Sequence, residues 1–309
     1  MRNTFADTLY EIAHRDRNII LMTGDLGYNV ITKFSEDLPR QFINAGVAEQ
    51  NMTGMACGLA LEGKRVFTYS IGNFNTLRCL EQIRNDVCYH NANVTMVCIG
   101  GGFCYGPLGI SHHATEDLAI LRAIPNLTVI APGDTTETEL AAKAICKHNG
   151  PVYLRLGKGG EPKVYDIDPD FEIGKAISIH NDGDVALLTT GGILKNAVEA
   201  REILSQKGVT CSLHSFHTLK PFDNDKLLKI LSKSKLIVTI EEHIKSGGLG
   251  GCAAEIIAES LDSNTKLLRL GLREGFSSEV GSQEYLRGLN GLNPEQIAES
   301  IYLKINDIS

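Results

Sequence analysis

The chain has 309 residues, 43% of them hydrophobic, and its 30 basic and 37 acidic residues give a formal net charge of −7. This length predicts two domains of about 150 residues each. The acidic balance argues against nucleic acid as a partner. A membrane span is not expected, because no apolar run approaches the ~18 residues that a spanning helix needs.

The N-terminal stretch HRDRNIILM has too short an apolar part, after too polar a start, for a signal peptide. The eight cysteines are scattered and form no CxxC pair, which argues against a disulfide framework or a zinc site. We therefore expect reduced core thiols, a cytoplasmic location and no metal site on this chain.

The first half alternates helix and strand patterns. FADTLYEIAHRD places Phe5, Leu9 and Ile12 on one stripe and predicts a helix. Then come a buried strand NIILMTG, an extended QFINAG, a helix over 44–63, a strand RVFTYS, a helix NTLRCLEQIRNDVCYHN, a buried strand NVTMVCIG, a loop GGGFCYGPLGISHHAT, a helix EDLAILRAI, a strand LTVIAP, a helix DTTETELAAKAICKH capped by Asp134, and a strand PVYLRL.

Glycines, prolines and carboxylates then gather in GKGGEPKVYDIDPDFEIGKA, which is typical of a linker. After it follow a strand DVALLTTG, a helix 195–207, a strand TCSLHSF, a helix 223–232, a strand LIVTIEEH, a helix 251–261, a strand KLLRLGL and a helix from Pro294. Such alternation predicts mostly parallel sheets flanked by helices. We predict an α/β chain with domains 1–160 and 180–309 and a linker 161–179.

The predicted helix NAGVAEQNMTGMACGLALEG is rich in small residues but carries one carboxylate, Glu49, near its start. Met52, Thr53, Ala56 and Ala60 share a helical face with it. Such a small face predicts close packing against another element, and it would also let two such helices approach across a subunit interface. A carboxylate there is costly to bury without a partner. The alternative is a solvated carboxylate that interacts with the helix dipole.

Three stretches, in this order, resemble transketolases and 1-deoxyxylulose-5-phosphate synthases. GVAEQNMTGMACGLALEGKRVFTYS and SHHATEDLAILRAIPNLTVIAPGD are similar to their pyrimidine-binding domain, and TIEEHIKSGGLGG is similar to the signature of their C-terminal domain. The resemblance covers essentially the whole chain. It implies a thiamine diphosphate enzyme that transfers a two-carbon ketol unit between sugars or sugar phosphates.

The resemblance also implies residue roles on the cofactor side. The family glutamate that matches Glu49 hydrogen-bonds N1′ of the cofactor's aminopyrimidine, so Glu49 is the expected catalytic residue. Phe74 matches the aromatic residue that stacks on the pyrimidine, although one extra residue between YS and LEQIR leaves the stacking residue open. Asp25 and Leu26, in TGDLG, match a pair beside the thiazolium ring; Asp25 could equally be a turn residue.

On the substrate side, His112 matches the family histidine that contacts the donor ketose, and we expect it to be catalytic. His113 is its expected neighbour in substrate binding. Arg155 and Lys158, in YLRLGKGG, fall where relatives place arginines that hold a substrate phosphate, although charged loop residues are often only solvated. Leu108 stands where transketolases usually have an aspartate, which predicts altered recognition of the donor hydroxyls.

One family motif is missing. Full-length transketolases bind Mg²⁺ and the diphosphate through Gly-Asp-Gly and a later asparagine, and TGDLG lacks the second glycine. The resemblance therefore implies the C-terminal subunit of a split transketolase, active only with an N-terminal subunit that binds Mg²⁺. The expected assembly is a heterotetramer with two copies of each subunit.

Four alternatives stay open at this point. Two are related thiamine enzymes, a deoxyxylulose-phosphate-type synthase and a 2-oxoacid dehydrogenase beta subunit, although the histidine loop favours sugar chemistry. The third is a nucleotide-binding module, because GGLGGCAAEII contains G-x-G-x-x-A before a helix. The fourth is a scaffold subunit that keeps the fold but only binds partners.

Overall fold

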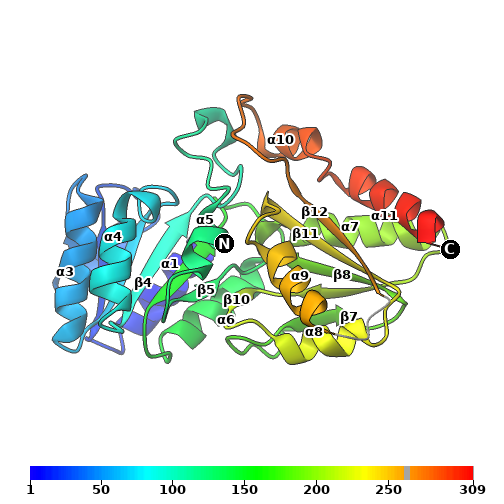
Figure 1. Cartoon of the computed structure of the whole chain (residues 1–309). Coiled ribbons are helices and arrows are strands. Elements are labelled where there is room, and N and C mark those ends of the chain that lie inside the picture. The colour runs from blue at the N-terminus through cyan, green and yellow to red at the C-terminus, as the bar shows by residue number, and fades with distance from the viewer. Residues whose placement is uncertain (261–264, 309) are drawn as a thin grey trace.

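The computed structural model describes residues 1–260 and 265–308 and contains two sheets covered by helices (Figure 1). The strands of the first sheet are β1 (Ile19–Thr23), β2 (Phe42–Asn44), β3 (Arg65–Ile71), β4 (Val94–Ile99), β5 (Thr128–Ile130), β6 (Val152–Leu156) and β10 (Thr218–Lys220). Those of the second are β7 (Ile177–His180), β8 (Val185–Thr190), β9 (Cys211–Ser215), β11 (Leu236–Ile244) and β12 (Lys266–Leu272).

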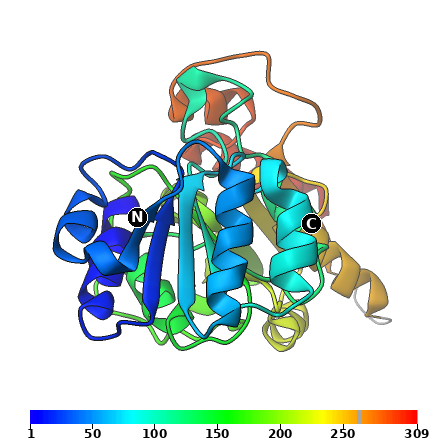
Figure 2. The ribbon, with the colours of Figure 1, turned by 90° about the vertical axis from the view of Figure 1, so that its left-hand side faces the viewer.

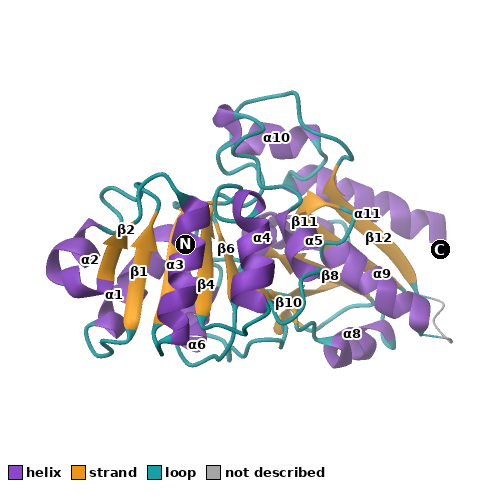
Figure 3. Cartoon of the chain, turned by 60° about the vertical axis from the view of Figure 1, so that its left-hand side comes forward, coloured by secondary structure: helices purple, strands orange, loops and turns teal. Residues whose placement is uncertain are grey.

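Both sheets are mostly parallel, which confirms the predicted α/β fold. The strand order is β10-β5-β6-β4-β3-β1-β2 in the first sheet and β12-β11-β8-β9-β7 in the second. The antiparallel pairs are β10 with β5 and β7 with β9. Figure 3 shows the two sheets side by side, each with helices packed against it.

The helices of the first half are α1 (Arg2–Ala13), α2 (Thr32–Asp37), α3 (Glu49–Leu61), α4 (Leu80–Gln82), α5 (Asp117–Arg122) and α6 (Thr135–Ile145). Those of the second half are α7 (Leu194–Gln206), α8 (Asn224–Leu231), α9 (Leu249–Glu259), α10 (Gln283–Leu289) and α11 (Pro294–Ile308). Among the described residues, no helix is long and apolar enough to cross a bilayer.

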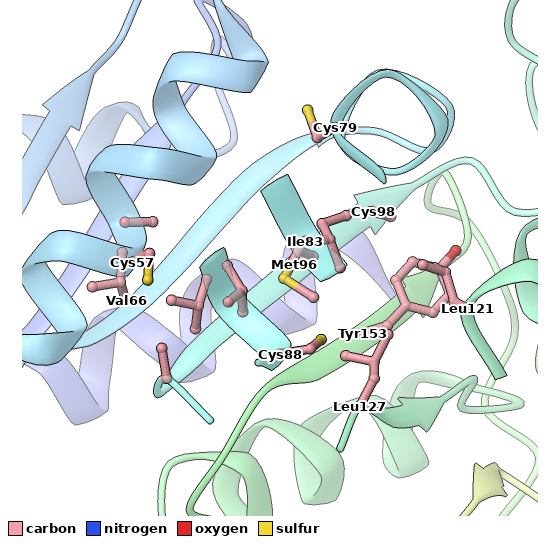
Figure 4. Close-up of a cluster of buried hydrophobic side chains, with 14 of the residues drawn as sticks. Cys57, Val66, Cys79, Ile83, Cys88, Met96, Cys98, Leu121, Leu127 and Tyr153 are labelled. Carbon is pink, nitrogen blue, oxygen red and sulfur yellow. The ribbon is translucent and has the colours of Figure 1, made fainter. Parts of the chain in front are cut away.

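Alternate residues of the strands feed two cores on opposite faces of the first sheet. Ile20 and Met22 of β1 belong to the core that includes α3 and α5, whereas Ile19 and Leu21 belong to the core under α1 and α6. Strands buried on both faces are continuously apolar, which explains why these runs could be predicted. Figure 4 shows the first of these cores, in which four cysteines take part; all eight cysteines of the chain are free.

The face of α3 that begins at Glu49 is buried inside the chain. Met52, Thr53, Ala56 and Ala60 are all buried, as the helical spacing predicted. This face is therefore not the one that approaches another subunit, which corrects that part of the expectation. In Figure 2, α3 (blue) and the helical segment 80–88 (cyan) lie side by side on the face of the sheet that is turned to the viewer.

Several segments differ from the sequence predictions. The helix expected over 75–91 is a 3₁₀ turn, then α4, then a π-helical turn over Ile83–Cys88. Four elements, α2, β7, β10 and α10, were not predicted, and β7 begins inside the segment expected to be a linker. Residues 157–176 form no helix or strand, yet Tyr165 of this segment is buried.

Candidate active site

Glu49 lies at the carboxyl edge of the first sheet, where α/β folds commonly bind ligands. Its side chain is 2% exposed, and its Oε2 accepts a hydrogen bond from Nη1 of Arg78 at 2.8 Å. Gly24, directly after β1, leaves room for it, because a Cβ there would lie 3.3 Å from Cγ of Glu49. The carboxylate that the sequence placed on a small apolar face is therefore buried beside a single cation.

Arg78 joins Glu49 to Phe74. The guanidinium carbon of Arg78 lies 4.5 Å from the centroid of the Phe74 ring, within cation–π range. The Arg78 side chain is 43% exposed, so it reaches this position from the solvent side. Sequence reasoning missed Arg78, because Phe74 precedes the helix predicted over 75–91 and their contact arises from the turn and 3₁₀ segment that join them.

His112 extends this group from the other side. Its ring lies 5.2 Å from that of Phe74 in an edge-on arrangement, and its Nδ1 lies 2.9 Å from Oγ of Ser111. Burial and the neighbouring His113 lower the pKa of His112 below its usual value, so the ring is neutral at neutral pH. The structure thus brings Glu49, Phe74 and His112 into one contact series, with Arg78 in its centre.

Asp25 and Leu26 follow Gly24 at the same edge of the sheet. Asp25 has a left-handed backbone, with φ of 58°. Its N–H donates to Oδ1 of Asn44 and its Oδ1 accepts from Nδ2 of Asn44, both at 3.0 Å. Asp25 and Leu26 line a cavity of about 190 Å³ beside Tyr28. Asp25 thus has a turn conformation and bonds to Asn44 next to the expected site, and its role beside the thiazolium ring stays a prediction.

His113 does not share the environment of His112. It is buried, its Nε2 lies 3.1 Å from the carbonyl oxygen of Gly106, and its ring meets the ring of Phe103 edge-on at 5.0 Å. The two consecutive histidines therefore face different surroundings. In this arrangement His113 contacts its own loop, whereas His112 faces the aromatic ring of Phe74.

Arg155 and Lys158 also lie in different surroundings. Arg155 is buried, and its Nε donates to Oδ2 of Asp117 at 2.8 Å while its Nη2 donates to the carbonyl oxygens of Ala114 and Glu242. Lys158 lies 5.7 Å from the ring of Tyr105, which is itself 6.0 Å from that of His112. Lys158 thus remains close to the His112 series, while Arg155 is held between the two halves of the chain.

Both cations line a polar cavity of about 680 Å³ between the two halves, together with Glu242 and Arg287. The cavity adjoins the predicted site through Lys158 and Tyr105. Across residues 1–260 and 265–308, no group of three histidine, cysteine or acidic side chains could hold a metal ion.

The glycine-rich segment after β11 has an internal partner. The carboxylate of Glu241 accepts the N–H groups of Leu249 and Gly250 at the start of α9, both at 2.8 Å. A dinucleotide pyrophosphate would need these same helix-terminal groups. Since Glu241 already occupies them, the nucleotide-binding interpretation of GGLGGCAAEII is wrong.

Comparison with known families agrees with this geometry. The family model described as "Transketolase, pyrimidine binding domain" matches residues 1–162, and the one described as "Transketolase, C-terminal domain" matches residues 174–297. Together they cover both sheets and the flanking helices up to the start of α11.

Individual relatives are similar over nearly their whole length. A protein of Methanocaldococcus jannaschii described as a transketolase C-terminal section is 39% identical over 305 residues, covering 97% of this chain and 95% of its own. A 6-deoxy-6-sulfo-D-fructose transketolase subunit of a Clostridium species is 36% identical over 303 residues, covering 98% and 93%. Among solved structures, a split gene transketolase described as an inactive beta4 tetramer has a TM-score of 0.89 at 31% identity, covering 97% and 96%.

Proposed function

The chain belongs to the transketolase family, and from that premise we propose that it is the C-terminal subunit of a thiamine diphosphate-dependent transketolase. The enzyme would transfer a two-carbon ketol unit between sugars or sugar phosphates. The observation that carries this proposal is the contact series of Glu49, Arg78, Phe74 and His112 at the carboxyl edge of the first sheet.

The contacts of Arg78 offer a test of whether these residues suit the cofactor's aminopyrimidine. A guanidinium is a flat group with N–H donors, and here it donates to Glu49 while its face meets Phe74. A flat heteroaromatic ring with an N–H at its edge would use the same two groups, the carboxylate as a hydrogen-bond acceptor and the phenyl ring as a stacking surface. The pair Glu49 and Phe74 therefore fits the pyrimidine, provided that Arg78 moves aside.

Bound thiamine diphosphate supplies the electron sink of the reaction. The chain's own residues then have separate tasks. Glu49 holds and exchanges a proton at N1′ of the aminopyrimidine, and its burial beside one cation keeps water from competing for that contact. Phe74 orients the ring. His112, neutral at neutral pH, offers a hydrogen bond to an oxygen of the donor sugar.

Lys158 is the better candidate for a substrate phosphate. It lines the open cavity and lies against Tyr105, one ring away from His112. The buried Nε of Arg155 already serves Asp117. Asp25 and Leu26 border the site from the end of β1, where we propose that they approach the thiazolium ring.

We infer that an N-terminal partner subunit binds the diphosphate and Mg²⁺, because this chain lacks Gly-Asp-Gly. Large apolar side chains are exposed around the site, among them Tyr28, Val47 and Leu77. Exposed apolar groups of this kind are typical of surfaces that a partner covers. We propose a cytoplasmic heterotetramer with two copies of each subunit.

Reconstitution tests this function. The purified chain and its partner subunit are assayed together and apart for ketol transfer, while thiamine diphosphate binding is followed by calorimetry. We expect transfer and tight binding only in the mixture. Tight cofactor binding by this chain alone would refute the split-subunit proposal. Pyruvate as donor provides the check on a deoxyxylulose-phosphate-type activity.

A further inference from the structure

The loop that carries His112 is closed at its base. The N–H of Gly102 donates to the carbonyl oxygen of Ala114 at 2.7 Å, and the N–H of Ala114 donates back at 3.1 Å. Residues 103–113 lie between these two and form what we call the histidine loop. In Figures 1 and 2 this loop (teal) rises above the sheets beside α10 (orange), which comes from the other end of the chain.

The first residue of the histidine loop is inserted into the second half of the chain. The side chain of Phe103 is 3% exposed and belongs to the core of the second sheet, together with Ile240 and Leu286. Its N–H donates to Oε1 of Glu242 at 2.7 Å. The loop therefore depends on β11 and α10 for its starting position.

Glu242 is a fully bonded buried carboxylate. It accepts from Nε of Arg287 at 2.8 Å and from Nε2 of Gln283 at 2.9 Å, in addition to the N–H of Phe103. Arg287 also donates to Oδ1 of Asn196, which anchors it to α7. Three segments far apart in the sequence thus meet at one carboxylate.

A second contact holds the middle of the histidine loop. A Cβ at Gly106 would lie 2.3 Å from the carbonyl oxygen of Gly281 and 2.8 Å from Cδ1 of Leu286. Only glycine permits this approach, because the nearest atom belongs to the backbone. The carbonyl oxygen of Gly106 also meets Nε2 of His113, so this position is connected to the residue next to His112.

The end of the loop is bonded to the first half of the chain, because Nδ2 of Asn73 donates to the carbonyl oxygens of Ser111 at 3.3 Å and of His113 at 2.9 Å. Leu108 and Ile110 are exposed, and ordering a loop of this length costs conformational entropy that its contacts must offset. For the start and middle of the loop, the second half of the chain provides those contacts through Phe103, Gly106 and Glu242.

We propose that the Glu242–Arg287 pair is a positioning device, by which the C-terminal half holds the histidine loop and so places His112 against Phe74. This inference rests on the proposed function for its catalytic consequence. Glu242 and Arg287 act through the histidine loop and do not touch the reacting atoms.

One experiment removes both charges together. Glu242→Gln/Arg287→Met leaves no uncompensated buried charge, which would otherwise risk unfolding. The matched control is Lys207→Met/Glu299→Gln, which removes an exposed ion pair of 3.0 Å in the same half of the chain. In the reconstituted enzyme we expect the donor kcat/KM to fall about tenfold to 10²-fold in the test variant, since small misplacements cost that much. The control and the affinity for thiamine diphosphate should change less than about twofold, on the scale of a surface pair.

A second experiment disturbs the loop without changing any charge. Gly106→Ala places a methyl group against the Gly281 carbonyl, whereas the control Gly251→Ala places one in α9 with its nearest neighbour 4.0 Å away. Hydrogen exchange of the full chain, followed by mass spectrometry, should show amides 103–113 exchanging at least about tenfold faster in Gly106→Ala and in the charge variant. Amides of α1 and α6 should keep their wild-type rates.

Unchanged exchange of the loop in both test variants would overturn the proposal, as would faster exchange with an unaltered donor kcat/KM. Arg287→Lys keeps the charge but loses the paired N–H donors of the guanidinium. Its donor kcat/KM should therefore lie between those of the charge variant and the wild type. A value equal to that of the charge variant would also count against positioning. If the wild-type pair lacks ketol transfer altogether, the proposed function fails, and the exchange data still decide whether the loop is held by Glu242.

Discussion

Two buried carboxylates of this chain, Glu49 and Glu242, are each paired with an arginine, yet their surroundings differ. Among the described residues, Arg78 is the hydrogen-bond donor to the Glu49 side chain, and Arg78 is 43% exposed. Glu242 is 4% exposed and accepts from Phe103, Gln283 and a buried Arg287. The first pair can exchange its partner, whereas the second cannot open without leaving several donors unsatisfied. A buried ion pair thus indicates a reactive site or a structural one according to how many other groups it serves.

The largest effect should come from Glu49→Gln in the reconstituted enzyme. The amide keeps the shape of the side chain but cannot exchange the proton at N1′, so we expect activity to fall by about 10²–10⁴-fold, the usual range for a general acid–base group. Deuterium exchange at the cofactor's C2 should slow in parallel. Folding and assembly should persist, since an amide is easier to bury than a carboxylate. A variant that assembles and exchanges C2 at the wild-type rate would show that Glu49 is not the catalytic carboxylate.

Arg287→Met should be the most destabilising single change at either pair. It leaves Glu242 buried without its cation, which typically costs about 3–5 kcal/mol. Urea unfolding followed by circular dichroism measures the free energy of unfolding directly. Restoration of stability by adding Glu242→Gln would attribute the loss to the unpaired charge; the absence of such recovery would assign it to packing.

His112→Ala should lower the donor kcat/KM by about 10-fold to 10²-fold, which is the value of one hydrogen bond to a group that carries or develops a charge. Binding of thiamine diphosphate should remain nearly intact, because the ring meets Phe74 only at its edge. Calorimetry of the reconstituted pair separates the two effects. Equal loss of donor kinetics and cofactor affinity would indicate a structural histidine instead.

Arg78→Met should destabilise the chain less than Arg287→Met, because Arg78 is 43% exposed and bonds Glu49, whereas the buried Arg287 also bonds Asn196 and Gly192. If Arg78 must leave Glu49 before the cofactor binds, thiamine diphosphate should bind the reconstituted variant more tightly than the wild-type complex, by up to about tenfold, the value of one hydrogen bond. Weaker binding would mean that Arg78 stays beside the bound cofactor. The same calorimetric titration distinguishes tighter from weaker binding of thiamine diphosphate.

The smallest effect concerns pH. Burial and His113 lower the pKa of His112 below 6.5 in the folded protein. The neutral ring therefore predominates at neutral pH, and its contribution is lost as pH falls through the lowered folded pKa. The donor kcat/KM of the wild type, divided by that of His112→Asn, should stay constant from pH 8 to pH 7 and fall on the acid side. A ratio that changes around pH 7.5 would contradict this assignment.

Local patterns predicted the elements that depend on local physics. The apolar runs of β1, β4 and β6 mark strands buried on both faces, and the cap of α6 was visible as Asp134, which accepts the N–H of Glu137 at 2.8 Å. The π-helical turn of Ile83–Cys88 was not predicted, since its sequence satisfies the period of an ordinary helix.

The site was predicted less completely than the fold, and for a related reason. Glu49 and His112 carried family motifs, whereas Arg78 acquires its meaning only from a partner 29 residues away. Arg155 matched a family phosphate position, but its ion pair with Asp117 spans 38 residues and follows no period. Long-range pairs of this kind leave no pattern in a single sequence.

Strand β10 has a consequence for how the chain can be divided. It comes from the C-terminal half, yet it pairs antiparallel with β5 at the edge of the first sheet, and the N–H of Ala131 donates to the carbonyl oxygen of His217 beside it. An N-terminal fragment that ends within residues 161–179 would lack β10. The unpaired backbone groups of β5 would then be exposed, and exposed strand edges promote association between copies. Separate expression of the two halves should therefore yield pieces that aggregate, whereas the intact chain should stay free of such association.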